Sequence, residues 1–209
     1  MTDMWPHSVS MTTIVDELAS RDARLAEVIR SHPLCDLGVI PETSSNFESL
    51  VESVIAQQVS VKAADTIFRR LHDVVDGELT PERVDKVSDA LLRDCGLSGS
   101  KTRTIRGLAE ATVSGQLALE SLHLIDDDDI VSRQLNALWG IGPWTVDMFL
   151  MNRLGRLDVW PTGDLGFRRG WEKIYGLTEQ ISPADLHREG HRFAPYRSVV
   201  AWYCWIEWD

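Results

Sequence analysis

The sequence predicts an all-α protein, and three observations favour this fold class. Apolar residues recur at helical spacing along most of the chain, as in Leu50, Val51 and Val54. The alternation of apolar and polar residues that is typical of β-strands is almost absent. Glycine, proline and capping residues stand where helices would begin and end. We therefore expect a helical globule over residues 1–209, as one domain or two closely associated lobes.

The predicted helices follow one another along the chain with short breaks. The first spans about residues 12–31 and ends before Pro33, because a residue that precedes proline is pushed out of the helical conformation. Residues 33–45 are expected to form a loop. Two helices flank a polar break at residues 57–60 (QQVS), and Ser60 is a suitable cap for the second. Further helices are expected over about residues 82–95, 101–114, 128–138, from Pro143 onward, 165–175, 183–192 and 196–207.

The composition is that of a globular protein without a membrane segment. Of its 209 residues, 44% are hydrophobic and 25% are charged. No stretch approaches the roughly 20 apolar residues that span a bilayer, and the first residues lack the features of a signal peptide. The cysteines Cys35, Cys95 and Cys204 are scattered without metal-binding spacing, which suits a reducing compartment. We expect a cytoplasmic protein with no membrane partner, no zinc and no iron–sulfur cluster.

The net charge bears on whether nucleic acid is a partner. The formal charge of −11 opposes nonspecific attraction to DNA, which carries about one negative charge per 1.7 Å. Basic residues nevertheless cluster at 101–106 and 168–173, and uncharged backbone amides can also contact phosphate. The charge therefore leaves a nucleic-acid role open.

A glycine-rich turn between two predicted helices is the first functional candidate. Residues 138–145 read LWGIGPWT. A helix, a Gly-x-Gly turn and a second helix expose backbone N–H groups that can bind an anion, and glycine lets the backbone approach it closely. A tight corner between two helices, with glycines that serve packing alone, is the alternative interpretation.

The longer pattern resembles the helix-hairpin-helix (HhH-GPD) superfamily of base-excision DNA glycosylases, in its 3-methyladenine DNA glycosylase II branch. The resemblance covers roughly residues 12–208, with its motifs in the expected order. Those motifs are residues 55–60 (IAQQVS), 96–98 (GLS), 140–145 (GIGPWT), 161–164 (PTGD) and 195–198 (PYRS). It implies two helical lobes with a cleft between them, one formed by about residues 1–45 and 150–209, the other by about 46–149 including the hairpin 136–146. A minimal form without the N-terminal sheet domain of some members is expected.

The resemblance assigns the catalytic role to Asp164. Breaking an N-glycosidic bond builds positive charge on the sugar, and a nearby carboxylate stabilises this charge and can orient the attacking water. An aspartate at the start of a helix is also a common N-cap. The two roles are compatible, because a capping aspartate is held in one orientation.

Trp144 bears on the reaction type. Some relatives carry a lysine two residues after the second hairpin glycine, and its amine attacks the sugar before the strand is cut. Trp144 occupies this position, so we expect a hydrolase without AP-lyase activity that needs no cofactor. The chain also lacks the four spaced cysteines of the cluster-bearing branch.

The remaining site residues are also assigned by the resemblance. Aromatic rings attract the cationic bases that alkylation creates, and the base pocket is assigned to Trp144, Trp205 and Trp160. Trp202 and Trp208 share the helical spacing of Trp205 and are expected in the core. DNA contacts are assigned to Gln57, Gln58, Gly140, Gly142, Thr145 and Lys101, with Gln58 at the position that fills the gap left by a flipped base.

The expected function is excision of alkylated purines from damaged double-stranded DNA by a monomer. A monovalent cation, K⁺ or Na⁺, is expected on the main-chain carbonyls of Asn136, Leu138 and Gly140. Two alternatives stay open. One is a glycosylase of the same fold for deaminated or mismatched bases, and the other is a DNA-binding module without catalysis. Surface charge is an alternative role for Lys101, and a plain surface turn is the alternative for Gln58.

Overall fold

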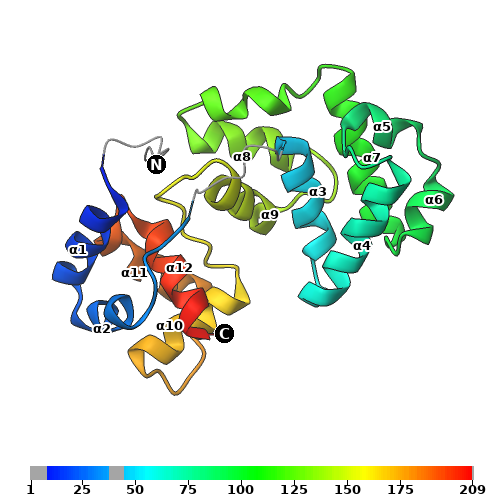
Figure 1. The fold of residues 1–209 in the computed structure, drawn as a ribbon. Coiled ribbons are helices and arrows are strands. Elements are labelled where there is room, and N and C mark those ends of the chain that lie inside the picture. The colour runs from blue at the N-terminus through cyan, green and yellow to red at the C-terminus, as the bar shows by residue number, and fades with distance from the viewer. Residues whose placement is uncertain (1–8, 38–44, 209) are drawn as a thin grey trace. The chain divides into compact units, whose positions relative to one another are not determined.

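The computed structural model describes residues 9–37 and 45–208, and all regular structure there is helical. The all-α prediction is confirmed, since no strand occurs in these two ranges. The described residues divide into two compact units, one of residues 9–37 and 150–208 and the other of residues 45–149 (Figure 1). Each unit has its own apolar core.

The first unit joins helices from the two ends of the chain. In Figure 1 the blue helices α1 and α2 lie with the orange and red helices α10 and α12. Helices α10 and α12 pack so closely that a Cβ atom at Gly170 would overlap the backbone carbonyl of Cys204. The elements are α1 (Met11–Arg21), α2 (Ala23–Ser31), α10 (Leu165–Tyr175), α11 (Pro183–Gly190), the 3₁₀ helix η3 (His191–Phe193) and α12 (Arg197–Trp208).

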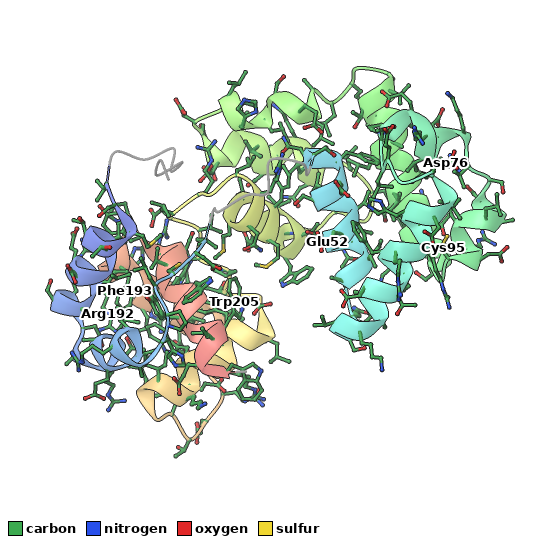
Figure 2. The ribbon with its side chains drawn as sticks, viewed as in Figure 1. Glu52, Asp76, Cys95, Arg192, Phe193 and Trp205 are labelled. Carbon is green, nitrogen blue, oxygen red and sulfur yellow. The ribbon has the colours of Figure 1, made fainter. Side chains whose placement is uncertain are left out.

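A buried carboxylate links three elements of the first unit. Asp22 accepts hydrogen bonds from the hydroxyl of Tyr175 (2.9 Å) and from Arg192 (2.7 Å), which is labelled beside Phe193 in Figure 2. Burial opposes the charged form of Asp22, but the backbone N–H of Leu25, the Tyr175 hydroxyl and the Arg192 charge hold its pKa below the usual value. This hub connects α2 to α10 and η3.

The second unit is built around helix α3 (Asn46–Ala56). Its buried face, which includes Phe47, Leu50 and Val54, packs against helices α4, α7 and α9. The other elements are α4 (Val61–Val74), α5 (Pro81–Lys86), α6 (Asp89–Asp94), α7 (Gly99–Val113), the 3₁₀ helix η1 (Leu119–Leu124), α8 (Asp128–Asn136) and α9 (Pro143–Met148). Helix α9 passes directly into a π-helix, η2 (Phe149–Arg153), where sequence predicted only continued helix.

Several helix boundaries differ from the prediction for local reasons. The helix expected over residues 12–31 is broken at Asp22, whose extended backbone and side chain start a new helix by accepting from Leu25 N (2.9 Å). The helix expected over 82–95 is two helices, because Ser88 caps α6 through Leu91 N. Helix η1 was not predicted. Of the loop expected at 33–45, residues 38–44 lie outside the described residues.

The C-terminal tryptophans and the cysteines occupy different environments. Trp208 is 51% exposed and Trp202 is partly exposed, so the expectation that both lie in the core is wrong. Helix α12 instead buries Val199, Val200 and Tyr203. Cys35, Cys95 and Cys204 are buried free thiols, and burial raises the pKa of Cys35 to about 12. Within 9–37 and 45–208, no helix combines the length and apolar character needed to cross a bilayer.

Candidate functional site

The predicted hairpin forms in the second unit and is fixed on helix α7. Gly140 has a φ of +83°, and a Cβ atom there would overlap the hydroxyl of Thr104 on α7. Ile141 is buried, and its N–H donates to the carbonyl of Leu138 (3.2 Å). Gly140 therefore meets both demands that favour glycine, a left-handed conformation and a close approach.

Helix α9 begins at Pro143 without a side-chain cap. Gly142 occupies the N-cap position, and its carbonyl accepts from Val146 N (3.1 Å). The first N–H groups of a helix have no partner within the helix and carry its partial positive charge. The turn and the start of α9 have the local geometry that the sequence predicted, and their contact with phosphate stays a prediction.

Gln57 and Thr145 connect the loop at residues 57–60 to the hairpin. The side-chain amide of Gln57 donates to Thr145 Oγ1 (2.8 Å) and lies 3.5 Å from the carbonyl oxygen of Gly140. Thr145 is only 1% exposed. The Thr145 hydroxyl is therefore held by Gln57 within the protein, and the DNA contact assigned to Thr145 stays a prediction for its main chain.

Gln58 lies at the tip of the short loop between α3 and α4. It is exposed and has a positive φ of 55°, which is unusual for a residue with a side chain. Ser60 caps α4 by accepting from Ala63 N, as predicted. This geometry presents Gln58 to solvent, and its role in filling a DNA gap stays a prediction.

The side chain of Lys101 forms hydrogen bonds with the protein backbone. Its Nζ donates to the carbonyls of Ile55 and Gln57, both at 2.8 Å. Burial lowers its pKa. Carbonyls at the end of a helix lack partners, and Lys101 satisfies those at the end of α3. The expected phosphate contact is therefore corrected: Lys101 positions the loop that carries Gln58.

Replacement of Lys101 tests this structural role. We expect Lys101→Met to lower the free energy of unfolding by about 1–3 kcal/mol, because two part-buried carbonyl oxygens lose a charged donor. Urea denaturation followed by circular dichroism measures the change. Lys62→Met, an exposed lysine on α4, is the control and should change stability by less than about 0.5 kcal/mol. Equal stability of the two variants would contradict the assignment.

Asp164 stands at the start of α10 in the first unit and is anchored by two donors. Its Oδ1 accepts from the backbone N–H of Phe167 (2.6 Å) and from the indole N–H of Trp205 (2.7 Å). Figure 2 shows Trp205 on α12, beside the beginning of α10. Gly166 lies next to this pair. A Cβ atom added at Gly166 would lie 3.6 Å from Trp205 Nε1. The carboxylate is thus both an N-cap and a side chain of fixed orientation.

The start of α12 holds the segment that leads to Asp164. Ser198 Oγ donates to the carbonyl of Arg156 (2.7 Å) and accepts from Val159 N (2.8 Å). Arg197 forms a two-pronged ion pair with Asp158 at 2.7 and 3.0 Å. Two residues of the 195–198 motif therefore hold residues 156–159, which directly precede the 161–164 motif.

The three tryptophans assigned to the base pocket differ in exposure. Trp160 is 8% exposed, packs edge-on against Phe167 and Trp171, and donates its indole N–H to the carbonyl of Leu186 (2.8 Å). Its place in the core of the first unit corrects the expectation of a direct base contact. Trp144, in the second unit, and Trp205 are partly exposed, as a stacking role requires.

Sequence reasoning missed two contacts of this region. The hydrogen bond from Trp205 to Asp164 joins residues 41 positions apart, and the stacking of Arg103 on Trp139 joins helix α7 to the hairpin turn. The spacing of Trp205 within its helix marked an aromatic stripe but gave no sign of its polar partner. The sequence indicated the basic cluster at residues 101–106. It did not indicate that Lys101 and Arg106 bind backbone carbonyls whereas Arg103 stacks on a tryptophan.

Comparisons with known proteins agree with this geometry. A family model described as HhH-GPD superfamily base excision DNA repair protein matches residues 51–195. DNA-3-methyladenine glycosylase 1 of Schizosaccharomyces pombe is 33% identical over 167 residues, covering 78% of this chain and 73% of that protein.

Solved structures show the same similarity. The S. pombe 3-methyladenine DNA glycosylase Mag1, in complex with abasic DNA, has a TM-score of 0.82 at 28% identity, covering 92% of this chain and 95% of that one. A DNA-3-methyladenine glycosidase from Bacillus halodurans has a TM-score of 0.79 at 36% identity, covering 95% and 89% respectively.

Proposed function

Because the chain belongs to the HhH-GPD superfamily of base excision DNA repair proteins, we propose that it removes alkylated purines from double-stranded DNA. The reaction is hydrolysis of the N-glycosidic bond, which leaves an abasic site. The observation that carries this proposal is the anchored carboxylate of Asp164, in the motif that the family uses for catalysis. The names of the relatives, which are 3-methyladenine glycosylases, support the substrate class.

Asp164 stabilises the charge that develops on the sugar. As the bond to the base lengthens, the deoxyribose gains oxocarbenium character, and a fixed carboxylate lowers the energy of that state. The donors Phe167 N and Trp205 Nε1 hold Oδ1, so the carboxylate does not have to reorganise during the reaction. Trp205 is thus a positioning residue for Asp164 as well as a candidate stacking surface.

The substrate class follows from the lability of the damaged base. Alkylation of a purine at N3 or N7 makes the base cationic and a better leaving group, so modest stabilisation of the sugar is sufficient. The partly exposed indoles of Trp144 and Trp205 suit a cationic ring, at about 0.5–2 kcal/mol each. Stacking without a dedicated set of hydrogen bonds predicts acceptance of several alkylated bases.

The second unit binds the DNA backbone. The turn at Gly140 and Gly142 and the beginning of α9 offer backbone N–H groups to a phosphate. The exposed Gln58 enters the stack in place of the flipped base, at a cost of a few kcal/mol of unstacking. One chain contains all the motifs of the proposed reaction, so the proposal requires only a monomer.

A monovalent cation is part of the proposed phosphate contact. The carbonyls of Asn136, Leu138 and Gly140 belong to the end of α8 and the turn after it, where the helix dipole is negative. The carbonyl oxygen of Gly140 lies 3.5 Å from the side-chain amide of Gln57, and a carbonyl oxygen has two lone pairs, so it can also contact a cation. K⁺ or Na⁺ bound there would add positive charge beside the phosphate.

Water is the nucleophile in the proposed reaction, because the position of the lyase lysine is Trp144. We expect no covalent enzyme–DNA adduct when borohydride is added during turnover on damaged DNA, and an uncut strand until the abasic product is treated with alkali. The bifunctional alternative is distinguished by gel electrophoresis of the reaction. A trapped adduct would contradict the proposal.

Base-release assays on defined duplexes test the substrate class. Release from DNA containing methylated purines or ethenoadenine, with little release of uracil, is the expected pattern. Preferential release of hypoxanthine or uracil would instead assign the chain to a glycosylase for deaminated bases. Binding to DNA without release of any base would indicate a module that lacks catalysis.

A further inference from the structure

An exposed tryptophan, with an arginine stacked on its ring, directly precedes Gly140 of the hairpin turn. Trp139 precedes Gly140 in the hairpin and is 50% exposed. The guanidinium carbon of Arg103, from α7, lies 4.1 Å above the centre of the Trp139 ring. Such a cation–π pair stabilises both side chains in one geometry.

The two elements that bring this pair together are fixed to each other. Thr104, next to Arg103 on α7, lies so close to Gly140 that only glycine fits there. Thr104 is itself 3% exposed, and its hydroxyl donates to the carbonyl of Ser100 (3.0 Å). The position of Arg103 relative to the hairpin turn is therefore set by the packing of α7 and not by the arginine side chain alone.

Arg103 differs from the other two basic residues of its cluster. Lys101 donates to the carbonyls at the end of α3, and Arg106 donates to the carbonyls of Val84 and Asp85, both at 2.9 Å. Arg106 also pairs with Asp89 (3.0 Å). Among residues 9–37 and 45–208, no carboxylate or carbonyl accepts from Arg103, which has Trp139 as its contact.

The chemistry of this arrangement fits a phosphodiester. Stacking covers a face of the guanidinium and leaves its N–H edge for a partner in the plane of the group. A guanidinium edge matches the paired oxygens of a phosphate, and the resulting charge-assisted hydrogen bonds are strong. Under the proposed function, the acceptor is the DNA strand that the adjacent turn would hold.

We propose that Arg103, presented by Trp139, is a phosphate contact of this protein and extends the hairpin site by one phosphate along the same strand. The inference rests on the proposed function, because it places DNA at the hairpin. A positive charge of Arg103 beside the hairpin turn would offset locally part of the repulsion between a chain of net charge −11 and DNA.

The salt dependence of binding to undamaged duplex DNA tests the proposal. We expect Arg103→Gln to weaken binding about fivefold to tenfold, because one charge-assisted contact is lost. The slope of log K against log salt concentration should become shallower by about 0.9, the value for one phosphate contact. Arg69→Gln, which removes an exposed arginine from α4 of the same unit, should leave the slope unchanged.

A double-mutant cycle tests whether Trp139 acts by holding Arg103 in place or by contacting DNA through its own indole. Trp139→Ala should weaken binding about two- to fivefold when Arg103 is present. In the Arg103→Gln background the same change should have little further effect. Thermal melting of each variant verifies that the fold is retained.

The outcomes distinguish this inference from the proposed function. Equal slopes for Arg103→Gln and the unmodified protein, or equal shifts for Arg103→Gln and Arg69→Gln, would overturn the phosphate contact. Additive losses in the double mutant would overturn presentation by Trp139. These experiments measure only the affinity for undamaged DNA. A protein that released no base would therefore still give an interpretable result for Arg103.

Discussion

Asp164→Asn is expected to reduce the rate of base release by about 10²–10³-fold or more, since it removes the negative charge that stabilises the developing sugar cation. An asparagine retains a side-chain oxygen that accepts from Phe167 N and Trp205 Nε1. Asparagine and aspartate are also equally good N-caps. The fold and the affinity for undamaged DNA should therefore change little. Single-turnover release of methylated purine, beside thermal melting, measures both effects.

Two further substitutions separate charge from capping. Asp164→Ala should lose activity and also about 0.5–2 kcal/mol of stability, because the helix loses its cap. Asp127→Asn makes the same chemical change at the N-cap of α8 and should retain full activity. Release by Asp164→Asn at the rate of Asp127→Asn would remove Asp164 from the catalytic role.

Gly170→Ala is expected to have the largest effect on stability, a loss of at least about 3 kcal/mol. The new Cβ atom would overlap the carbonyl oxygen and carbon of Cys204, so α10 and α12 would have to move apart. The obstacle is backbone, and no change of side-chain rotamer relieves it. Denaturation in urea followed by circular dichroism gives the free energy of unfolding.

Gly107 provides the matched control for that substitution. It lies inside α7, and a Cβ atom there meets no heavy atom within 4 Å. Gly107→Ala should stabilise the protein by about 0.5–1 kcal/mol, because alanine loses less conformational freedom in a helix. If Gly170→Ala unfolded at the same urea concentration as Gly107→Ala, the close packing of α10 and α12 would be wrong.

The helices could be predicted from sequence where periodicity and caps agree. Ser60 and Pro143 mark the starts of α4 and α9 as expected. The breaks at Asp22 and Ser88 could not be found from periodicity, because the apolar pattern continues through both residues. In each case a side chain caps the next helix, and a polar residue inside a periodic run is equally compatible with an unbroken helix.

The site could be predicted only as far as its local motifs. Residues 140–145 and 161–164 indicated the turn and the carboxylate, because their geometry depends on near neighbours in the chain. The roles of Lys101, Trp160 and Thr145 depend on partners distant in sequence, namely the end of α3, the carbonyl of Leu186 and the amide of Gln57. A single sequence does not record such contacts, so Lys101 and Thr145 were assigned to DNA binding and Trp160 to the base pocket.

The membership of the HhH-GPD superfamily, which the sequence resemblance indicated, is confirmed by the family match over residues 51–195. The match supports both the helical fold and a role in base excision repair of DNA.

The most direct test of the central claim is single-turnover release of methylated purines from duplex DNA by the unmodified protein. The account predicts that free base accumulates with time while the strand stays intact until alkali cuts it at the abasic site. Binding of the duplex without any release of methylated base would contradict it.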